Sequence, residues 1–200
     1  MLHWGEHGLG LSLLDASGHG VSPALRSASL STFLREDNLR HQVEGHDPGA
    51  MLTEANRHFP LTDDGNYCPI IVARLALRAH TLSYATAGHN GAFLHHHSGA
   101  VSWRTPPGLP LGFALPHTYG TVDRAVSPGD RLDCVSDGLY AVPAPTGALW
   151  GQARLEAAVR ARGPRPLAEV ITRTVEQATQ WLGHDRFPDD AAMIGRAISV

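Results

Sequence analysis

The sequence lacks the features that would assign it to several specialised classes of protein. No stretch approaches the roughly 20 apolar residues of a membrane-spanning helix, and the first ten residues do not have the pattern of a signal peptide. With 16 Lys and Arg against 19 Asp and Glu, the net charge is −3, so the basic surface of a nucleic-acid-binding protein is not expected. Its two cysteines are too few for a disulfide framework. We therefore expect a cytoplasmic protein, with no membrane insertion and no nucleic-acid partner.

The length of 200 residues predicts a single domain, over residues 1–200. Hydrophobic periodicity and turn residues predict its elements. Strands are expected at 8–14, 70–77, 81–87, 91–96, 100–103, 119–126, 131–135 and 192–198, and helices at 22–34, 47–56, 149–162 and 166–182. Ser22 is the expected N-cap of the first helix, Pro23 its first residue, and residues 63–66 and 106–116 the expected turn and loop. Strands in the middle with helices on either side predict an α+β fold with mainly antiparallel sheets.

Three aspartates occupy similar positions in this pattern. Asp15 and Asp137 follow apolar runs and precede glycine-containing turns, and Asp189 precedes the last strand. Carboxylates that converge repel one another unless a cation lies between them, and oxygen ligands favour Mg²⁺ or Mn²⁺ over zinc. A single aspartate before glycine is nevertheless more often a turn residue than a ligand. Spacing in the sequence does not show that the three meet.

Motifs along nearly the whole chain resemble those of the SpoIIE-type (RsbU-like) serine/threonine phosphatases of the PPM family. They are Asp15 to Ala24 (DASGHGVSPA) for D-x-S-G-H-G-x-x-A-A, Leu52 to Asn56 for L-x-x-x-N, Tyr84 to Asn90 (YATAGHN) for Y-x-x-A-G-H-x-P, Gly108 to Phe113 (GLPLGF) for G-x-P-L-G, Pro128 to Leu132 with Ser136 to Leu139 for P-G-D-x-L and S/T-D-G, and Asp189-Asp190 for D-D-x-T. Each motif is modest alone, and their common order makes the resemblance specific.

The resemblance implies a four-layer α-β-β-α sandwich of two mainly antiparallel sheets flanked by helices. It implies hydrolysis of phosphoserine or phosphothreonine by a water that bridges two Mn²⁺ or Mg²⁺ ions, without a covalent intermediate. Asp15 would bridge both ions, the Ala16 carbonyl would add a ligand, and Asp137 and Asp189 would hold the second ion. The implied substrate is a phosphorylated STAS-domain anti-anti-sigma factor, whose dephosphorylation releases a sigma factor by partner switching.

One departure from the family pattern bears on activity. Family members carry a G-G-D-x-x-D segment on the edge strand before the first motif, and its first aspartate is a metal ligand. The sequence has no such segment before Asp15. Two explanations stay open: the domain is truncated at its N-terminus, with the edge strand and an upstream sensor domain removed, or the protein lacks this ligand and binds metal weakly. The corresponding alternatives to a phosphatase are a degenerate, non-catalytic module that binds a regulator, and an α+β domain with no metal site.

Other candidate groups are given structural roles. Ser17 and His19 lie too close to Asp15 in the sequence to form a nucleophile–base–orienter triad with it. In the run His95–His97, at most two side chains share one face of a strand, so an exposed strand end is expected there and not a transition-metal site. His89 is expected to make structural hydrogen bonds, and Cys134 to be a small buried hydrophobic residue.

Overall fold

The structure is a computed structural model that describes residues 2–3, 8–18, 20–35, 39, 46–61, 65, 67–103, 108–160 and 166–199. The chain divides into two compact units: unit 1 comprises Met1–His89 and Thr105–Val126, and unit 2 comprises Asn90–Arg104 and Ser127–Val200. Of the predicted turn at 63–66 only Gly65 lies within the described residues, and His19 lies outside them. No helix in the described ranges combines the length and apolar character needed to cross a membrane.

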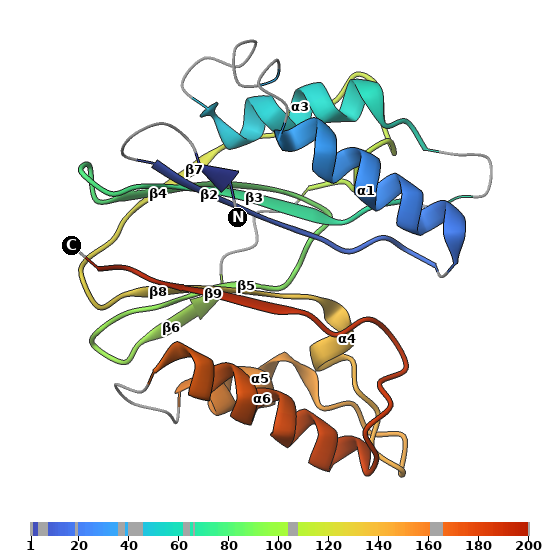
Figure 1. The fold of residues 1–200 in the computed structure, drawn as a ribbon, viewed down its shortest axis with the longest axis vertical. Helices are drawn as coiled ribbons and strands as arrows, with labels where there is room; N and C mark the ends of the chain where they lie inside the picture. The colour runs from blue at the N-terminus through green and yellow to red at the C-terminus, as the bar shows by residue number, and fades with distance from the viewer. Residues whose placement is uncertain are drawn as a thin grey trace. The chain divides into compact units, whose positions relative to one another are not determined.

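Unit 1 is a five-stranded antiparallel sheet with two helices on one of its faces (Figure 1). In sheet order its strands are β1 (Leu2–His3), β2 (Gly8–Leu14), β3 (Ile70–Ala76), β4 (Thr81–Ala87) and β7 (Val122–Ala125), and its helices are α1 (Val21–Arg35) and α3 (Pro48–His58). The short strand β1 occupies the edge beside β2, where Leu2 pairs with Gly10 and His3 with Leu9.

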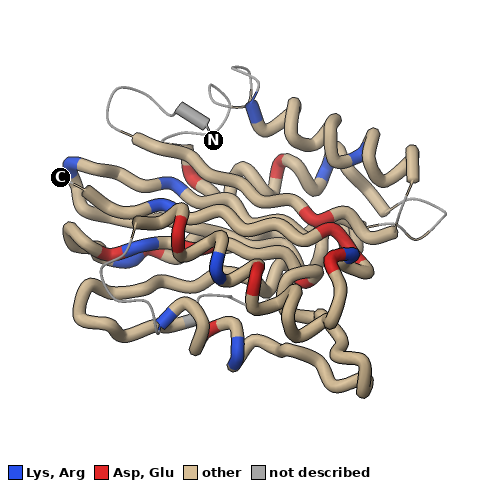
Figure 2. Tube along the Cα trace, turned by 60° about the horizontal axis from the view of Figure 1, so that its bottom comes forward, with Lys and Arg blue, Asp and Glu red and all other residues tan. Residues whose placement is uncertain are grey.

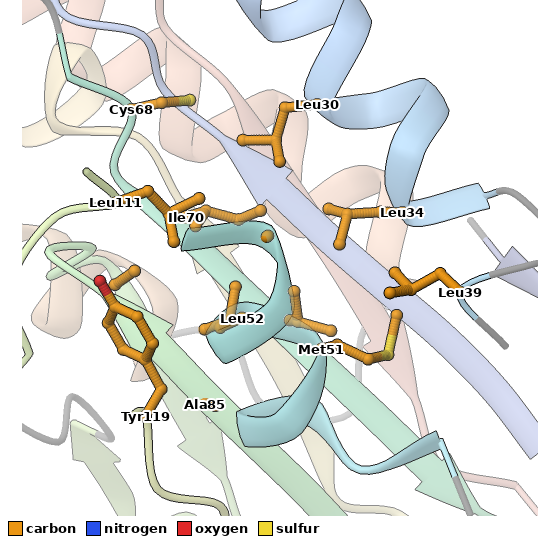
Figure 3. Packing of buried hydrophobic residues seen from close by; sticks show 13 residues of the cluster. Leu30, Leu34, Leu39, Met51, Leu52, Cys68, Ile70, Ala85, Leu111 and Tyr119 are labelled. Carbon is orange, nitrogen blue, oxygen red and sulfur yellow. The ribbon is translucent and has the colours of Figure 1, made fainter. Parts of the chain in front are cut away.

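The core of unit 1 lies between the helices and the sheet. Figure 3 shows α1 and α3 directing their apolar side chains toward the strands, with Tyr119 and Leu111 closing the cluster. The fully buried side chains of this cluster include Leu30, Leu34, Met51, Leu52, Cys68 and Ile70. Burying one side chain of the size of leucine contributes about 1.5–3 kcal/mol, so this face of each helix fixes its position on the sheet.

Both helices of unit 1 begin within two residues of their predicted starts. The helix α1 begins at Val21 and not at Pro23, because Gly20, with φ of 104°, already turns the chain and its carbonyl accepts the first helical bond from the Ala24 amide at 3.4 Å. A proline within this first turn costs no hydrogen bond, because the first four amides of a helix have no partner inside the helix. In α3, Asp47 is the N-cap, and its side chain accepts a bond from the Ala50 amide.

The strand predicted at 119–126 is shorter in the structure, because its first residues bond to a helix instead of the sheet. The Tyr119 amide donates to the Thr53 hydroxyl at 3.0 Å, and the Thr121 hydroxyl accepts from the Gly49 amide at 2.8 Å. Both partners are on α3. These contacts join residues 66 and 72 positions apart, which a local pattern of alternation cannot anticipate.

Asn56 fastens the glycine- and proline-rich loop to the end of α3. Its side-chain nitrogen donates to the Ala114 carbonyl at 2.9 Å, and its side-chain oxygen accepts from the Gly112 amide at 2.7 Å. Gly112 has a φ of 88°, and a Cβ atom added there would lie 2.6 Å from the Pro60 carbonyl carbon. The loop therefore needs glycine at residue 112 and a buried amide at residue 56.

Unit 2 is a four-stranded antiparallel sheet with its helices on one face (Figure 1). In sheet order its strands are β6 (Val101–Trp103), β5 (Ala92–His95), β8 (Arg131–Val135) and β9 (Met193–Ala197), and its helices are α4 (Asp137–Tyr140), α5 (Gly151–Arg160) and α6 (Leu167–Leu182). The sequence did not predict α4, because four residues are too few to show a helical period.

The longest helix, α6, buries a row of residues spaced four apart, Val170, Thr174, Ala178 and Leu182. This spacing places them on one face of a helix. The sequence predicted a helix over residues 166–182, but it did not predict that Thr174 and Leu182 belong to its buried face. Acidic and basic residues both occur on the helices of unit 2 (Figure 2), and Arg173 pairs there with Glu169 at 3.0 Å. The C-cap of the helix is Gly183, which has a left-handed backbone conformation. Its amide donates a hydrogen bond to the Thr179 carbonyl.

The strand β8 contains a fully buried carboxylate. Asp133 is 0 % exposed, and one of its oxygens accepts a hydrogen bond from the Arg131 guanidinium at 2.7 Å. The other oxygen accepts no bond from the described residues. Burial raises the pKa of Asp133 to about 6, although the charge of Arg131 acts in the opposite direction.

Replacement of Asn56 tests the attachment of the loop to α3. Asn56→Ala leaves the Gly112 amide and the Ala114 carbonyl without their partner, and we expect it to lower the free energy of unfolding by roughly 2 kcal/mol. Urea unfolding monitored by circular dichroism measures the loss. The control is Arg57→Ala, because this neighbouring side chain is 67 % exposed and forms an exposed ion pair with Glu54. It should change stability by less than about 0.5 kcal/mol. Equal effects of the two substitutions would contradict the assignment.

The pH dependence of stability tests the state of Asp133. Because its pKa is about 6 in the folded protein and 3.8 ordinarily, its contribution to stability is complete below the lower value and is lost as pH rises through the higher one. Asp133→Asn cannot ionise. The free energy of unfolding of this variant minus that of the wild type should therefore rise by an amount on the order of 2 kcal/mol between about pH 4.5 and about pH 7.5. The difference between their melting temperatures, measured across this range, should rise in parallel.

The exposed Asp123 supplies the control for this measurement. For Asp123→Asn, the difference in melting temperature from the wild type should stay flat over the same range of pH. A flat or falling difference for Asp133→Asn would show that the buried carboxyl is ionised throughout that range.

Candidate functional site

The three predicted aspartates lie in three separate parts of the chain. Asp15 directly follows β2 in unit 1, Asp137 opens α4 in unit 2, and Asp189 lies between α6 and β9, also in unit 2. Asp137 and Asp189 are exposed, and Asp15 is half-buried. The described residues contain no group of three or more His, Cys, Asp or Glu side chains close enough to hold a metal ion. The site is therefore considered as two parts, one in each unit.

In unit 1, hydrogen bonds on both sides of Ala16 hold the segment that carries Asp15. The Asp15 amide donates to the Pro69 carbonyl and the Ser17 amide to the Tyr67 carbonyl, both at 2.9 Å. The Ser17 hydroxyl donates to the same Tyr67 carbonyl at 2.9 Å and accepts from the Tyr67 amide at 2.8 Å. The backbone of Asp15 and Ala16 is thus anchored at two points to the chain that leads into β3.

The buried thiol of Cys68 lies in the segment to which Asp15 is anchored. Burial raises the pKa of Cys68 to about 11, with Arg26 lowering it and the negative charge of Asp15 adding to the rise. The thiol is therefore protonated at neutral pH, and a protonated thiol is a poor metal ligand. Both cysteines are free and buried, and the prediction that Cys134 is a small buried residue is confirmed.

In unit 2, Ser136 joins the loop of Asp137 to the loop of Asp189. Its hydroxyl donates to the Asp190 carbonyl and accepts from the Ala192 amide, both at 2.8 Å. Its own amide donates to the Ala192 carbonyl at 3.0 Å. Although Ser136 occupies the N-cap position of α4, its side chain makes no capping bond, because the hydroxyl is turned toward the other loop.

The same two loops also pack closely through Gly138. A Cβ atom added at Gly138 would collide with the Asp190 carbonyl oxygen and would lie 2.8 Å from its carbon. One oxygen of Asp189 accepts a bond from the Asp190 amide at 2.8 Å, which fixes that side chain locally. The structure therefore brings the loops of Asp137 and Asp189 together and leaves both side chains exposed.

The chemistry of these donors fits a hard divalent cation. The predicted ligands are three carboxylates and the Ala16 carbonyl, all of them oxygen donors, and the neighbouring thiol of Cys68 is protonated. Such a set suits Mg²⁺ or Mn²⁺ and not zinc. The exposure of Asp137 and Asp189 leaves them accessible to a cation and to a phosphorylated substrate.

Two residues that position these loops were not among the predicted site residues. Ser17 and Ser136 both lie within the motifs that carried the family resemblance, in D-x-S-G-H-G and S/T-D-G, but no local pattern indicates their partners. Both hydroxyls are bonded to backbone groups.

The histidine run and the aspartate of P-G-D form a separate polar cluster. Asp130 is buried, and it accepts bonds from the His97 amide at 2.9 Å and the Ser127 amide at 3.0 Å. Burial opposes its ionisation, but these bonds outweigh burial and lower the pKa of Asp130. His96 and His97 both contact this carboxylate, and no group suited to a metal is found among the described residues. The histidines thus close the hairpin of β5 and β6.

Comparison with known proteins shows the family of this chain. The family model "Stage II sporulation protein E (SpoIIE)" matches residues 5–196. The chain is 26% identical over 139 residues to the phosphoserine phosphatase RsbP of Bacillus subtilis, with 67% of this chain and 34% of RsbP covered. The chain thus spans about a third of the length of this relative.

Solved structures share the fold. The SiaA PP2C domain of Pseudomonas aeruginosa matches with a TM-score of 0.83 at 19% identity, covering 96% of this chain and 76% of that one. The PP2C phosphatase domain of SpoIIE from Bacillus subtilis, solved with a fragment of its regulatory domain, matches with a TM-score of 0.80 at 16% identity, covering 98% and 56%. These likenesses confirm the predicted α+β fold class. The chain therefore belongs to the SpoIIE family, as a phosphatase domain of the PPM type.

Proposed function

We propose that this domain is a Mn²⁺- or Mg²⁺-dependent protein phosphatase that hydrolyses phosphoserine or phosphothreonine on a regulatory protein. The observation that carries the proposal is the joining of the Asp137 and Asp189 loops through Ser136, in a chain of the SpoIIE family. The relative RsbP is named a phosphoserine phosphatase. The proposed substrate is a phosphorylated STAS-domain anti-anti-sigma factor, met in the cytoplasm, with an upstream sensor domain as a further partner.

Four residues of this chain would hold the ions. The Asp15 carboxylate would bridge two ions and the Ala16 carbonyl would add a ligand, while Asp137 and Asp189 would hold the second ion. When bound, two such ions lower the pKa of a coordinated water and offset the charge of the phosphoryl oxygens. The backbone anchors at Ser17 and Ser136 would keep the ligands in place.

The hydroxyl groups of Ser17 and Ser136 are not available as nucleophiles. The Ser17 hydroxyl is bonded to both backbone groups of Tyr67, and the Ser136 hydroxyl to Asp190 and Ala192. A serine that attacks phosphorus needs a base to accept its proton, and neither hydroxyl has such a partner among these bonds. The arrangement therefore favours direct attack by water over a phosphoserine intermediate.

A second candidate function is a degenerate phosphatase domain that binds a regulator without turnover. One observation favours it: the described residues hold no group of three or more His, Cys, Asp or Glu side chains that could hold a metal ion. The two functions differ in one measurable outcome, because a binding module retains the phosphorylated protein and releases no phosphate.

Replacement of Asp137 tests the proposed reaction. The wild-type chain, with Mn²⁺ and a STAS protein phosphorylated on serine, should release phosphate, and chelation by EDTA should abolish the release. Asp137→Asn removes one ligand charge, and we expect it to lower the rate at least about a hundredfold, or about 2.7 kcal/mol in the barrier. Phosphate release measured with a coupled assay, together with a phosphate-affinity gel, gives both values.

The matched control is Asp123→Asn, which removes an exposed carboxylate from β7 and should retain the wild-type rate. The same assays on a chain extended by any native upstream codons would measure the contribution of an edge strand. Phosphate release that resists EDTA, or that is equal in Asp137→Asn and the wild type, would contradict the proposal. Tight binding without release from either chain would establish the second candidate.

A further inference from the structure

We propose that Ser17 and Ser136 are positioning residues whose hydroxyls set the metal affinity of this site. The inference rests on the proposed function, because it concerns the carboxylates proposed as ligands. Each hydroxyl both donates and accepts a hydrogen bond, and each pair of bonds goes to the backbone of a segment at least 50 residues away in the sequence. Each of these serines lies within two residues of a predicted ligand.

The bonds of Ser136 control the distance between two loops. Its hydroxyl bonds to the Asp190 carbonyl and the Ala192 amide. Ser136 directly precedes Asp137 in the sequence, and its two partners lie one and three residues after Asp189. A serine at the start of a helix ordinarily accepts a bond from an amide of the first turn, but here that capping bond is absent. The hydroxyl is used to hold the second loop, and its loss would free the two aspartates to move apart.

Preorganisation of the ligands gives this restraint its energetic importance. The bonds of the Ser136 hydroxyl go to backbone groups of the other loop and involve no cation. Loops that are joined in this way keep their predicted ligands near one another before an ion binds. Groups that orient the ligands of a metal in this way typically affect its affinity by about 10- to 100-fold.

The bonds of Ser17 control the direction of the backbone at Ala16. The Asp15 amide and the Ser17 amide anchor the residues on both sides of Ala16 to the segment of Tyr67 to Pro69. The Ser17 hydroxyl doubles the second anchor by bonding to both the amide and the carbonyl of Tyr67. Without the hydroxyl, one bond remains there, and the predicted carbonyl ligand of Ala16 can rotate.

Titration of Mn²⁺ into the chain tests the role of Ser136. We expect Ser136→Ala to weaken Mn²⁺ binding, measured by isothermal titration calorimetry, by roughly 10- to 100-fold. Ser136→Thr keeps the hydroxyl and should remain within about threefold of the wild type. In the metal-free protein with EDTA, hydrogen exchange at the Ala192 amide should be faster in Ser136→Ala than in the wild type or in Ser136→Thr.

The control in unit 2 is Thr174→Val. The Thr174 side chain is 0 % exposed and its hydroxyl donates to the Val170 carbonyl at 2.8 Å, within α6. The substitution removes a buried hydroxyl without touching either loop, so it should lower the melting temperature and leave the Mn²⁺ affinity unchanged. Equal losses of affinity in Thr174→Val and Ser136→Ala would overturn the proposal, because they would reflect stability alone.

The control for Ser17 in unit 1 is Thr53→Val. The Thr53 hydroxyl also donates to one backbone carbonyl and accepts from one backbone amide, those of Gly49 and Tyr119. We expect Ser17→Ala to weaken Mn²⁺ binding by roughly tenfold and Thr53→Val to leave it unchanged.

The outcomes separate this inference from the proposed function. If Ser136→Ala and Ser17→Ala bind Mn²⁺ as strongly as the wild type does, the positioning role is overturned and the phosphatase proposal stands. Loss of Mn²⁺ affinity in both variants, with no phosphate released by the wild type, would support the positioning role and overturn the phosphatase proposal. A wild type that binds no Mn²⁺ would overturn both.

Discussion

The hydrogen bonds that join Ser136 to Asp190 and Ala192 are the interaction on which the candidate site in unit 2 depends. They connect the end of β8 to the chain entering β9, next to the point where Gly138 packs against the Asp190 carbonyl. Pairing of β8 with β9 ends at Val135 and Met193, and the serine continues the connection beyond the last strand residues. Two loops that carry predicted ligands are thereby joined by bonds from a serine side chain to backbone groups.

Unit 1 uses the same principle at Asp15. The strand β2 ends at Leu14, and bonds from the Asp15 amide and from Ser17 extend its pairing to the residues before β3. The rigid support comes from the core beneath α1 and α3 (Figure 3). Farther along the chain, Asn56 attaches the glycine-rich loop to α3 with its buried side chain. The family motifs of this unit therefore include a predicted ligand, Asp15, and two residues that hold loops in place, Ser17 and Asn56.

Three aspartates within or beside β8 show how strongly environment determines the role of one residue type. Asp130 is buried and bonded by amides, which lowers its pKa. Asp133 is buried beside Arg131, and its pKa is raised to about 6. Asp137 is exposed at the start of α4. The first closes a hairpin, the second forms a buried ion pair, and only the third is available to a ligand.

The sequence by itself determined the family, the fold class and most of the helices and strands. Motifs and periodicity are local, and Asp15, Asp137 and α6 follow from neighbours a few residues away. The tertiary structure alone decided that the Tyr119 amide bonds to the Thr53 hydroxyl on α3, that Asp133 is buried, and that the Ser136 hydroxyl bonds to the loop of Asp189. Each of these rests on contacts between residues far apart in the chain or on burial. Burial and hydrogen-bond partners are set by packing, and no local pattern encodes them.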